Sequence, residues 1–221
     1  MSSRTPPRSA FTPRERALVD ELRTPRQVQR WLRRLPYNWG KQGETQRSFR
    51  GVVKFGEAHC LETVLAAATI LDQHGYPPMV LDLESRDGLD HVLFVFRHEG
   101  RWGAVGRSRD WGLHGRPPVF TTIPALARTY MDPFVDGSGR LVRWGTANLD
   151  DLVRVDWRLS ARNVWAVEQA LIDMRHRRIT MPQVRYQRMR RRYLALKERT
   201  GRTPDARTVR ELYGAQVDRW W

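Results

Sequence analysis

The sequence predicts an α+β fold in which one buried helix packs on a small antiparallel sheet, with helical segments before and after it. The helix is predicted over residues 60–74, where apolar residues and alanines lie on nearly all sides of the helix, as is typical of a helix inside a domain. The sheet is predicted from residues 78–85, 90–97 and 101–108, which are short, largely apolar and separated by turn residues.

Length and composition narrow the class of protein. The chain has 221 residues, of which 40% are hydrophobic and 29% charged, which suits one folded domain with appendages and excludes a wholly disordered chain. We find neither an apolar run of about 18 residues, as a membrane span needs, nor an apolar signal segment near residue 1. A single cysteine excludes an intrachain disulfide framework. We therefore expect a cytoplasmic protein that does not contact membranes.

The N-terminal region begins with residues 1–10, whose Ser, Pro and Arg content predicts a disordered tail. Residues 12–23 and 24–35 each open with Thr-Pro and carry Glu or Gln three residues after the threonine. This spacing is typical of a capping box, and it predicts two short amphipathic helices. Residues 36–58, rich in Gly and polar side chains, are expected to form a loop region.

The predicted central helix stops at Gly75, a common residue just past a helix end. Beyond the three strands we expect a loop over residues 110–122, a helix over residues 123–132 and a further strand over residues 139–147. Residues 11–156 are therefore assigned to one α+β domain that includes the N-terminal helices.

Residues 157–221 are predicted to form a basic helical extension. Helices are expected over residues 160–174 and 181–201, and Thr203 and Pro204 are expected to open a last short helix within residues 203–221. The closing pair, Trp220 and Trp221, is expected to pack back on the domain or on a partner, because two large apolar side chains are unusual at an exposed terminus.

The formal net charge of +15 is unevenly distributed, with +8 over residues 1–50, −3 over residues 51–156 and +10 over residues 157–221. The basic helix combines Arg190, Arg191 and Arg192 with nearby tyrosines, and arginines with aromatic neighbours suit contacts to nucleic-acid phosphates and bases. A solvated helix face, or a surface docked on the acidic central domain, explains the same residues. Charge alone therefore leaves the partner open.

Cys60 stands at the start of the predicted central helix. There its thiol faces unpaired backbone N–H groups and the positive end of the helix dipole, both of which lower a thiol pKa. His91 begins a predicted strand 31 residues later and is the histidine best placed to act as its base. The alternative is that Cys60 is a small buried hydrophobe and His91 a structural histidine. His59 is expected to point away from the thiol, in a structural or accessory role.

A third group should orient the imidazole, and the hairpin register indicates where it lies. A turn centred between Glu99 and Gly100 pairs residues whose numbers sum to about 199, which sets His91 opposite Ser108. Gly106 then shares the face of His91, because side chains alternate along a strand. Asp110 follows the strand and can fold back. Ser108 and Asp110 are therefore the two candidates.

These residues resemble a known family. Cys60 at a helix start, His91 on a following strand and the hairpin closing with Trp102 resemble the core of the transglutaminase-like branch of the papain-like cysteine peptidase superfamily. The segment over residues 50–120 is similar to bacterial proteins grouped near it. The resemblance implies a papain-like fold, Cys60 as nucleophile and His91 as general base. The family's third residue is usually an aspartate, where this chain has Gly106, so Ser108 or Asp110 replaces it, the site is a dyad, or activity is lost.

The activity implied by the resemblance is acyl transfer at an amide or thioester carbonyl of a peptide or protein, with no metal or other cofactor. Backbone N–H of Cys60 is the expected oxyanion donor, and Trp39 and Gln42 are further candidates by analogy. The alternative function is an inactive scaffold that binds nucleic acid or an acidic protein through its Arg-rich flanks. Four carboxylates precede or flank His91 and form either a cation site or a solvated strand edge: Asp82, Glu84, Asp87 and Asp90.

Overall fold

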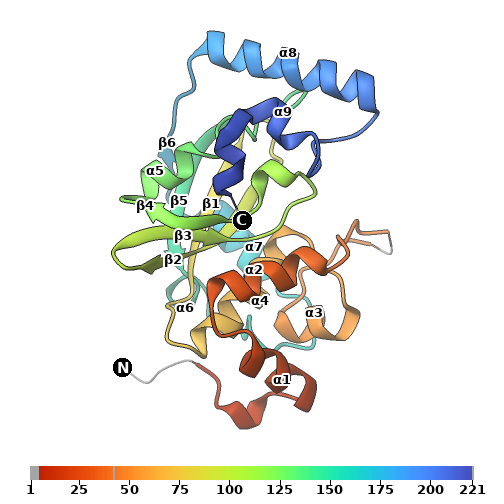
Figure 1. Cartoon of the computed structure of the whole chain (residues 1–221). Helices are drawn as coiled ribbons and strands as arrows, with labels where there is room; N and C mark the ends of the chain where they lie inside the picture. Colours follow the sequence, from red (N-terminus) through yellow and green to blue (C-terminus); the bar gives the residue numbers. More distant parts are fainter. Residues whose placement is uncertain (1–4, 42, 221) are drawn as a thin grey trace.

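The protein folds around one antiparallel sheet, as Figure 1 shows for a computed structural model that describes residues 5–41 and 43–220. The described part contains six strands in the order β4-β3-β2-β1-β5-β6, all paired antiparallel. Helices cover both faces of the sheet, so the α+β prediction is confirmed. The strands are β1 (Met79–Ser85), β2 (His91–His98), β3 (Arg101–Val105), β4 (Arg116–Phe120), β5 (Leu141–Asn148) and β6 (Arg177–Arg178).

Two hydrophobic cores lie on the two faces of the sheet. The first contains residues of α1 (Pro13–Glu21), α2 (Pro25–Arg34), α3 (Phe49–Phe55), α4 (Cys60–Asp72), α6 (Leu149–Leu152) and α7 (Trp165–Asp173). The second contains residues of α5 (Ile123–Arg128), α8 (Gln183–Thr200) and α9 (Val209–Tyr213). Helix α4 is buried along almost its whole length, as its all-round apolar sequence predicts.

Strand β2 shows how one sequence serves both cores. Val92, Phe94 and Phe96 belong to the core around α4, whereas Leu93 and Val95 belong to the opposite core. This period of two, with both faces covered, explains why the strand is apolar almost throughout.

The register predicted for the hairpin of β2 and β3 is confirmed within the ladder. His98 pairs with Arg101 and Phe94 pairs with Val105, so that each pair sums to 199. The ladder ends at Val105, three residues before Ser108. Ser108 therefore lies beyond the paired strand.

Both N-terminal helices begin at the predicted capping boxes. Thr12 Oγ1 accepts the N–H of Glu15 at 3.3 Å, and Glu15 Oε2 accepts the N–H of Thr12 at 2.7 Å. Thr24 and Gln27 repeat the arrangement at the start of α2. The Thr-Pro signals were therefore sufficient to place these helices.

Two elements occur where loops were predicted. Helix α3 lies within residues 36–58, with Ser48 capping its first turn and Gly56 ending it in the left-handed conformation. Strand β4 lies within residues 110–122 and contains Pro117 and Pro118. Proline is tolerated there because β4 is an edge strand, with only one neighbour to pair with.

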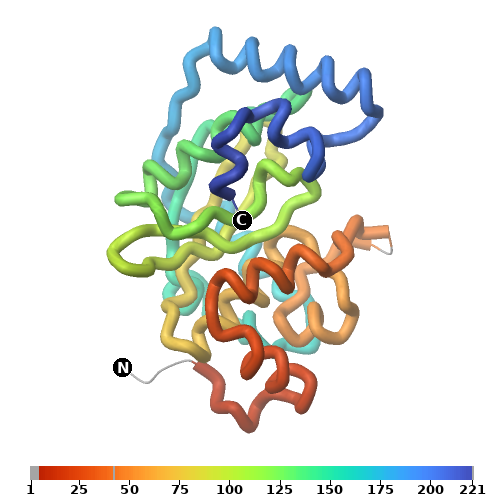
Figure 2. Tube along the Cα trace, in the orientation of Figure 1, coloured from red at the N-terminus to blue at the C-terminus, as the bar shows by residue number. Residues whose placement is uncertain are grey.

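Packing continues across residue 156, the predicted domain boundary. Val167 and Leu171 of α7 belong to the core around α4, and Arg178 of β6 pairs with Arg143 of β5. The last α-helix begins at Val209 rather than near Thr203. Figure 2 shows how the chain then returns to the middle of the molecule.

Both ends of the described chain lie against the folded body. Arg8–Ala10 form a short 3-10 turn within the predicted tail, and the carbonyl of Pro6 accepts Gln73 Nε2 at 2.8 Å. Trp220 packs on Tyr213, with ring centroids 5.8 Å apart, whereas Trp221 lies outside the described residues.

Candidate active site

The start of α4 is shaped by hydrogen bonds that leave Cys60 as its first helical residue. His59 occupies the N-cap position, and its N–H donates to Glu62 Oε2 at 3.1 Å. The carbonyl of His59 accepts the N–H of Thr63 at 2.9 Å, which opens the helix. Cys60 is half-buried, and its side chain faces a cavity.

Glu62 ties the preceding loop to this helix start. Its carboxylate is fully buried and accepts hydrogen bonds from Asn38 Nδ2 at 3.1 Å, Thr45 Oγ1 at 2.6 Å and the N–H of Arg47 at 3.0 Å, besides the one from His59. A buried carboxylate is stable only when its oxygens are hydrogen-bonded, so this network fixes the loop against Cys60.

His91 is held by a main-chain oxygen. The residue begins β2 and is 3% exposed, and its Nε2–H donates to the carbonyl of Leu113 at 2.8 Å. With Nε2 engaged, Nδ1 is the ring nitrogen available to Cys60. Burial tends to raise the pKa of the Cys60 thiol, but hydrogen bonds from the side chains of His59 and His91 outweigh it and lower the pKa to about 6.

His59 is a second histidine on the same sulfur, which differs from the expectation that it points away. Its Nε2–H donates to the carbonyl of Thr45 at 2.7 Å. Burial tends to lower the pKa of His59, but its hydrogen bond and charge interaction with Cys60, followed by the charge of Glu62, raise it to about 9. At neutral pH a cationic ring therefore lies beside the thiol.

The cavity in front of Cys60 has a volume of about 330 Å³ and is lined on its polar side by Tyr37, Asp82, His91, Ser108 and Asp110. Tyr37, which the sequence analysis did not single out, is close enough to Cys60 to interact with its charge. Burial and the charge of Cys60 raise the pKa of Tyr37 well above its usual range, so its hydroxyl stays protonated.

Ser108 and Asp110, the predicted orienting residues, line the cavity with His91. Ser108 Oγ accepts the N–H of Asp110 at 3.3 Å, and one carboxylate oxygen of Asp110 accepts Arg109 Nε at 3.2 Å. The hydrogen bond on His91 Nε2 is made by the carbonyl of Leu113. The structure thus brings both residues to the site, while a backbone atom anchors the imidazole.

Gly106, at the position of the family's aspartate, is enclosed. Gln29 of α2 clamps its backbone, accepting the N–H of Gly106 at 2.9 Å and donating to its carbonyl at 3.0 Å. A Cβ atom built on Gly106 would lie 2.7 Å from Leu93 Cδ2. An acidic side chain therefore fits here only if the buried side chain of Leu93 shifts.

Of the two residues suggested by analogy as further oxyanion donors, the structure describes one, Trp39. Trp39 is 63% exposed and packs edge-on against Tyr37, with ring centroids 4.9 Å apart. It lines a separate surface hollow with Lys41 and Gly43. Gln42 lies outside the described residues.

The four carboxylates around His91 each have a partner in the protein. Asp82 Oδ2 accepts His176 Nε2 at 2.9 Å and Asp90 Oδ1 accepts the N–H of Ser85 at 2.7 Å. Asp87 accepts the hydroxyl of Ser85, and Glu84 pairs with Arg143. Across residues 5–41 and 43–220, no group of three or more His, Cys, Asp or Glu residues is arranged to hold a metal ion.

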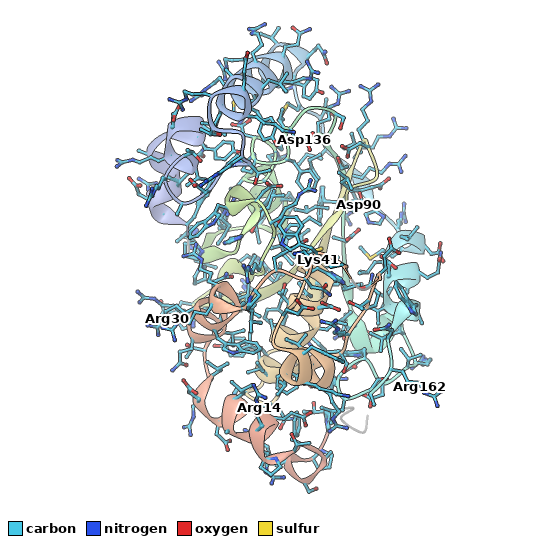
Figure 3. All side chains as sticks on the ribbon, turned by 90° about the vertical axis from the view of Figure 1, so that its right-hand side faces the viewer. Arg14, Arg30, Lys41, Asp90, Asp136 and Arg162 are labelled. Atoms are coloured by element: carbon cyan, nitrogen blue, oxygen red, sulfur yellow. The ribbon has the colours of Figure 1, made fainter. Side chains whose placement is uncertain are left out.

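Several arginines of α8 bind the protein itself. Arg185 forms an ion pair with Asp132 at 2.7 Å, and Arg190 and Arg192 donate to the carbonyls of Gly137 and Glu211. Figure 3 places Arg14, Arg30 and Arg162 around one half of the molecule and Asp90 and Asp136 in the other, with Lys41 between them. Within the described ranges no helix is both long and apolar enough to cross a membrane.

Comparison with known proteins adds little to this geometry. No family model and no curated protein matches the chain. Among solved structures, EGTA-treated LapG from Legionella pneumophila is similar with a TM-score of 0.36 and 9% sequence identity, covering 74% of this chain and 93% of that one. A likeness at this level does not establish a shared activity, so the function has to be argued from the site.

Proposed function

We propose that the protein is a cysteine-dependent acyl-transfer enzyme of the transglutaminase-like, papain-like class, acting on an amide or thioester carbonyl of a peptide or protein. One observation carries the proposal. The Cys60 thiol stands at the first turn of a buried helix and lines one cavity with His91, whose imidazole helps to lower the thiol pKa and is anchored through Nε2 at 2.8 Å to the carbonyl of Leu113. This is the arrangement of an activated nucleophile with an oriented base.

The nucleophile is ionised at neutral pH in this proposal. A thiol whose pKa is about 6 is mostly thiolate at pH 7. In the proposed mechanism His91 receives the proton that the thiol gives up, and the imidazolium of His59 adds a positive charge beside the sulfur. Both charges favour the thiolate over the thiol.

The reaction begins when the Cys60 thiolate attacks the substrate carbonyl, forming a C–S bond and moving an electron pair onto the carbonyl oxygen. Backbone N–H groups of the first turn of α4, which lack intrahelical acceptors, and the protonated hydroxyl of Tyr37 are the donors proposed to stabilise that oxyanion. Collapse of the intermediate breaks the bond to the leaving amine, which takes the proton of His91.

A thioester on Cys60 remains after this first half. His91, now neutral, removes a proton from an incoming water or amine, which attacks the thioester carbonyl. Breaking the C–S bond releases an acid or a new amide and restores the thiolate with its imidazolium. Hydrolysis and transfer therefore use the same groups and differ only in the acceptor that reaches the cavity.

The test is the rate of alkylation by iodoacetamide across pH 5–9. Because Cys60 is the single cysteine, the label reports on this site alone. We expect a midpoint near pH 6 in the native protein and near about 8.5 in urea. A native midpoint equal to that of a free thiol, together with a Cys60→Ala variant that leaves peptidase and transamidation assays unchanged, would refute the proposal.

A second candidate is a binding protein on an inactive scaffold, supported by the absence of an acid at Gly106 and by the net charge of +15. Its partner would be nucleic acid or an acidic protein held by the basic flanks. Binding should weaken steeply with salt and depend on Arg188 and Arg191, which are exposed on α8. A salt-independent response, or equal binding by the variant with both arginines changed to glutamine, would exclude it.

A further inference from the structure

Arg116 is a fully buried arginine at the start of β4. Its guanidinium donates to the carbonyls of Gly112 at 2.7 Å, His114 at 2.7 Å and Gly115 at 3.2 Å. Burial lowers the pKa of Arg116 to about 10, so it remains a cation at neutral pH. A desolvated charge is tolerated only where dipoles replace the lost water, and these carbonyls do so.

Each of the four carbonyls of residues 112–115 accepts a hydrogen bond from Arg116 or from His91. Arg116 takes three of the four, and the remaining one, the carbonyl of Leu113, accepts the Nε2–H of His91 at 2.8 Å. The same four-residue segment thus binds the buried cation of Arg116 through three carbonyl oxygens and the candidate base, His91, through the fourth. Any shift of the segment on Arg116 would displace the oxygen that holds His91.

The segment has little freedom to relax. A Cβ atom on Gly112 would lie 2.8 Å from Pro133 and 2.9 Å from the ring of Tyr213, so α9 presses directly on this backbone. The N–H of Trp111 donates to the carbonyl of Pro204 at 3.3 Å, which is a second link to the C-terminal part of the chain.

Aromatic rings cover the guanidinium of Arg116. Its central carbon lies 4.2 Å from the ring centroid of Tyr130 and 3.7 Å from that of Trp220. The hydroxyl of Tyr130 donates to the carbonyl of His114 at 3.1 Å. Cation–π contacts are strongest where water is excluded, as it is around this side chain. Trp220, near the end of the chain, therefore completes the enclosure of Arg116.

We propose that Arg116 and Trp220 are positioning residues for the candidate active site, which act on His91 through the carbonyl of Leu113. The C-terminal segment thereby sets the reactivity of a cysteine 160 positions earlier in the chain. The inference rests on the proposed function in one respect only, namely that Cys60 is the reactive group.

The test distinguishes the contribution of the aromatic ring of Trp220 from that of its apolar volume. Trp220→Leu keeps an apolar cover but removes the π-face, whereas Trp220→Phe keeps an aromatic ring on the guanidinium. Alkylation by iodoacetamide is measured from pH 5 to 9 on the full chain, with the melting temperature of each variant. Trp165→Leu, at a partly exposed tryptophan of α7, is the matched control.

We expect Trp220→Leu to raise the midpoint of Cys60 by about one pH unit, which lowers the alkylation rate at pH 6 about fivefold. Trp220→Phe and Trp165→Leu should keep the wild-type profile. Tyr130→Phe, which loses only the hydroxyl bond to His114, should shift the midpoint in the same direction by less. Tyr130→Phe therefore tests the same link to His91 with a smaller disturbance of the fold.

The outcomes distinguish this inference from the proposed function. A wild-type midpoint near 6 with an unchanged midpoint in folded Trp220→Leu overturns the positioning role and leaves the proposed function standing. Equal shifts in the Leu and Phe variants overturn the role of the aromatic face. A wild-type midpoint near that of a free thiol, together with unchanged assays in Cys60→Ala, refutes the proposed function itself.

Discussion

Two imidazoles, those of His91 and His59, act on the pKa of Cys60 in the candidate site. His91 is held from its far side by the carbonyl of Leu113, and His59 by the carbonyl of Thr45. The pKa of Cys60 is lowered to about 6 and that of His59 is raised to about 9. Between these values the thiolate and the His59 imidazolium coexist. We expect activity to rise with the ionisation of Cys60 near pH 6 and to decline as His59 loses its proton near pH 9.

Replacing His59 by glutamine should raise the alkylation midpoint of Cys60. Glutamine can still donate to the carbonyl of Thr45, but it carries no positive charge to stabilise the thiolate. We expect a shift of about one pH unit toward the value of a free thiol, about 8.5. His98→Gln, at the exposed end of β2, is the control. An unchanged midpoint in folded His59→Gln would show that His91 alone sets the ionisation.

Placing an aspartate at position 106 should destabilise the protein. Gly106→Asp brings a Cβ atom to 2.7 Å from Leu93 Cδ2, inside a backbone clamped by Gln29. Overpacking of this kind destabilises by about 1–3 kcal/mol. Gly137→Asp is the control, since a Cβ atom there meets no atom within 4 Å. Urea unfolding measures both, and a stable Gly106→Asp with faster alkylation would contradict this account.

Within the candidate site, residue positions were predictable from the sequence, but contacts made by backbone atoms were not. The positions of Cys60 at a helix start and His91 at a strand start were predictable, because caps and apolar alternation mark such places. The anchor of His91 was not, since a backbone carbonyl such as that of Leu113 leaves no residue signature. Tyr37 enters the site on a loop that is held to the buried Glu62 by residues 15 to 24 positions away in sequence, and no local pattern encodes such contacts.

At the scale of elements, a buried arginine joins segments that are distant in sequence. Arg158 donates to Asp150 at 2.6 Å and to Asp72 at 2.8 Å, linking the ends of α6 and α4. Its guanidinium also lies 3.9 Å from the ring of Trp157. The side chains of Arg158 and Asp72 are only 6% and 10% exposed, so this ion pair is buried.

Arg158→Met should therefore lower stability strongly. Removing one member of a buried ion pair leaves charges uncompensated and costs about 3–5 kcal/mol. Arg143→Met is the matched control, because its ion pair with Glu84 is exposed and should change stability by less than about 1 kcal/mol. Urea denaturation gives both values. Equal effects of the two substitutions would mean that the Arg158 cluster adds nothing beyond a surface pair.

Most elements were predictable because their signals are local. The capping boxes at Thr12 and Thr24 and the apolar run of α4 belong to single segments. Strand β4 was missed because Pro117 and Pro118 argue against a strand unless the segment lies at a sheet edge, and edge position is a property of the whole sheet. Helix α3 was missed because it is short, although Ser48 and Gly56 mark its ends.

At the scale of the whole molecule, we expect His114 to make the stability of the fold depend on pH in the acid range. This residue is 3% exposed, stacks on Trp111 and donates through Nε2 to the carbonyl of Ser108 at 3.0 Å. Burial lowers its pKa to about 3, against 6.5 for an unperturbed histidine. From about pH 6.5 down to about pH 3, only the unfolded chain takes up this proton, so the free energy of unfolding falls with pH.

The contribution of this one group is about 1.36 kcal/mol per pH unit within that window. We expect His114→Gln, whose amide can keep the bond to Ser108, to unfold in urea with a shallower pH dependence between pH 6 and pH 4. His98→Gln serves again as the exposed control. Identical pH slopes in wild type and His114→Gln would place the acid sensitivity elsewhere.

The single cysteine has a consequence for oxidation. A thiolate with a lowered pKa, open to a cavity, reacts readily with peroxide to give a sulfenic acid. The chain holds no second thiol to resolve that product as an internal disulfide. The sulfenic acid of Cys60 would therefore either react with a thiol of another molecule or be oxidised further to the irreversible sulfinic acid. The concentration of thiols and oxidants around the protein would therefore determine how long Cys60 stays reactive.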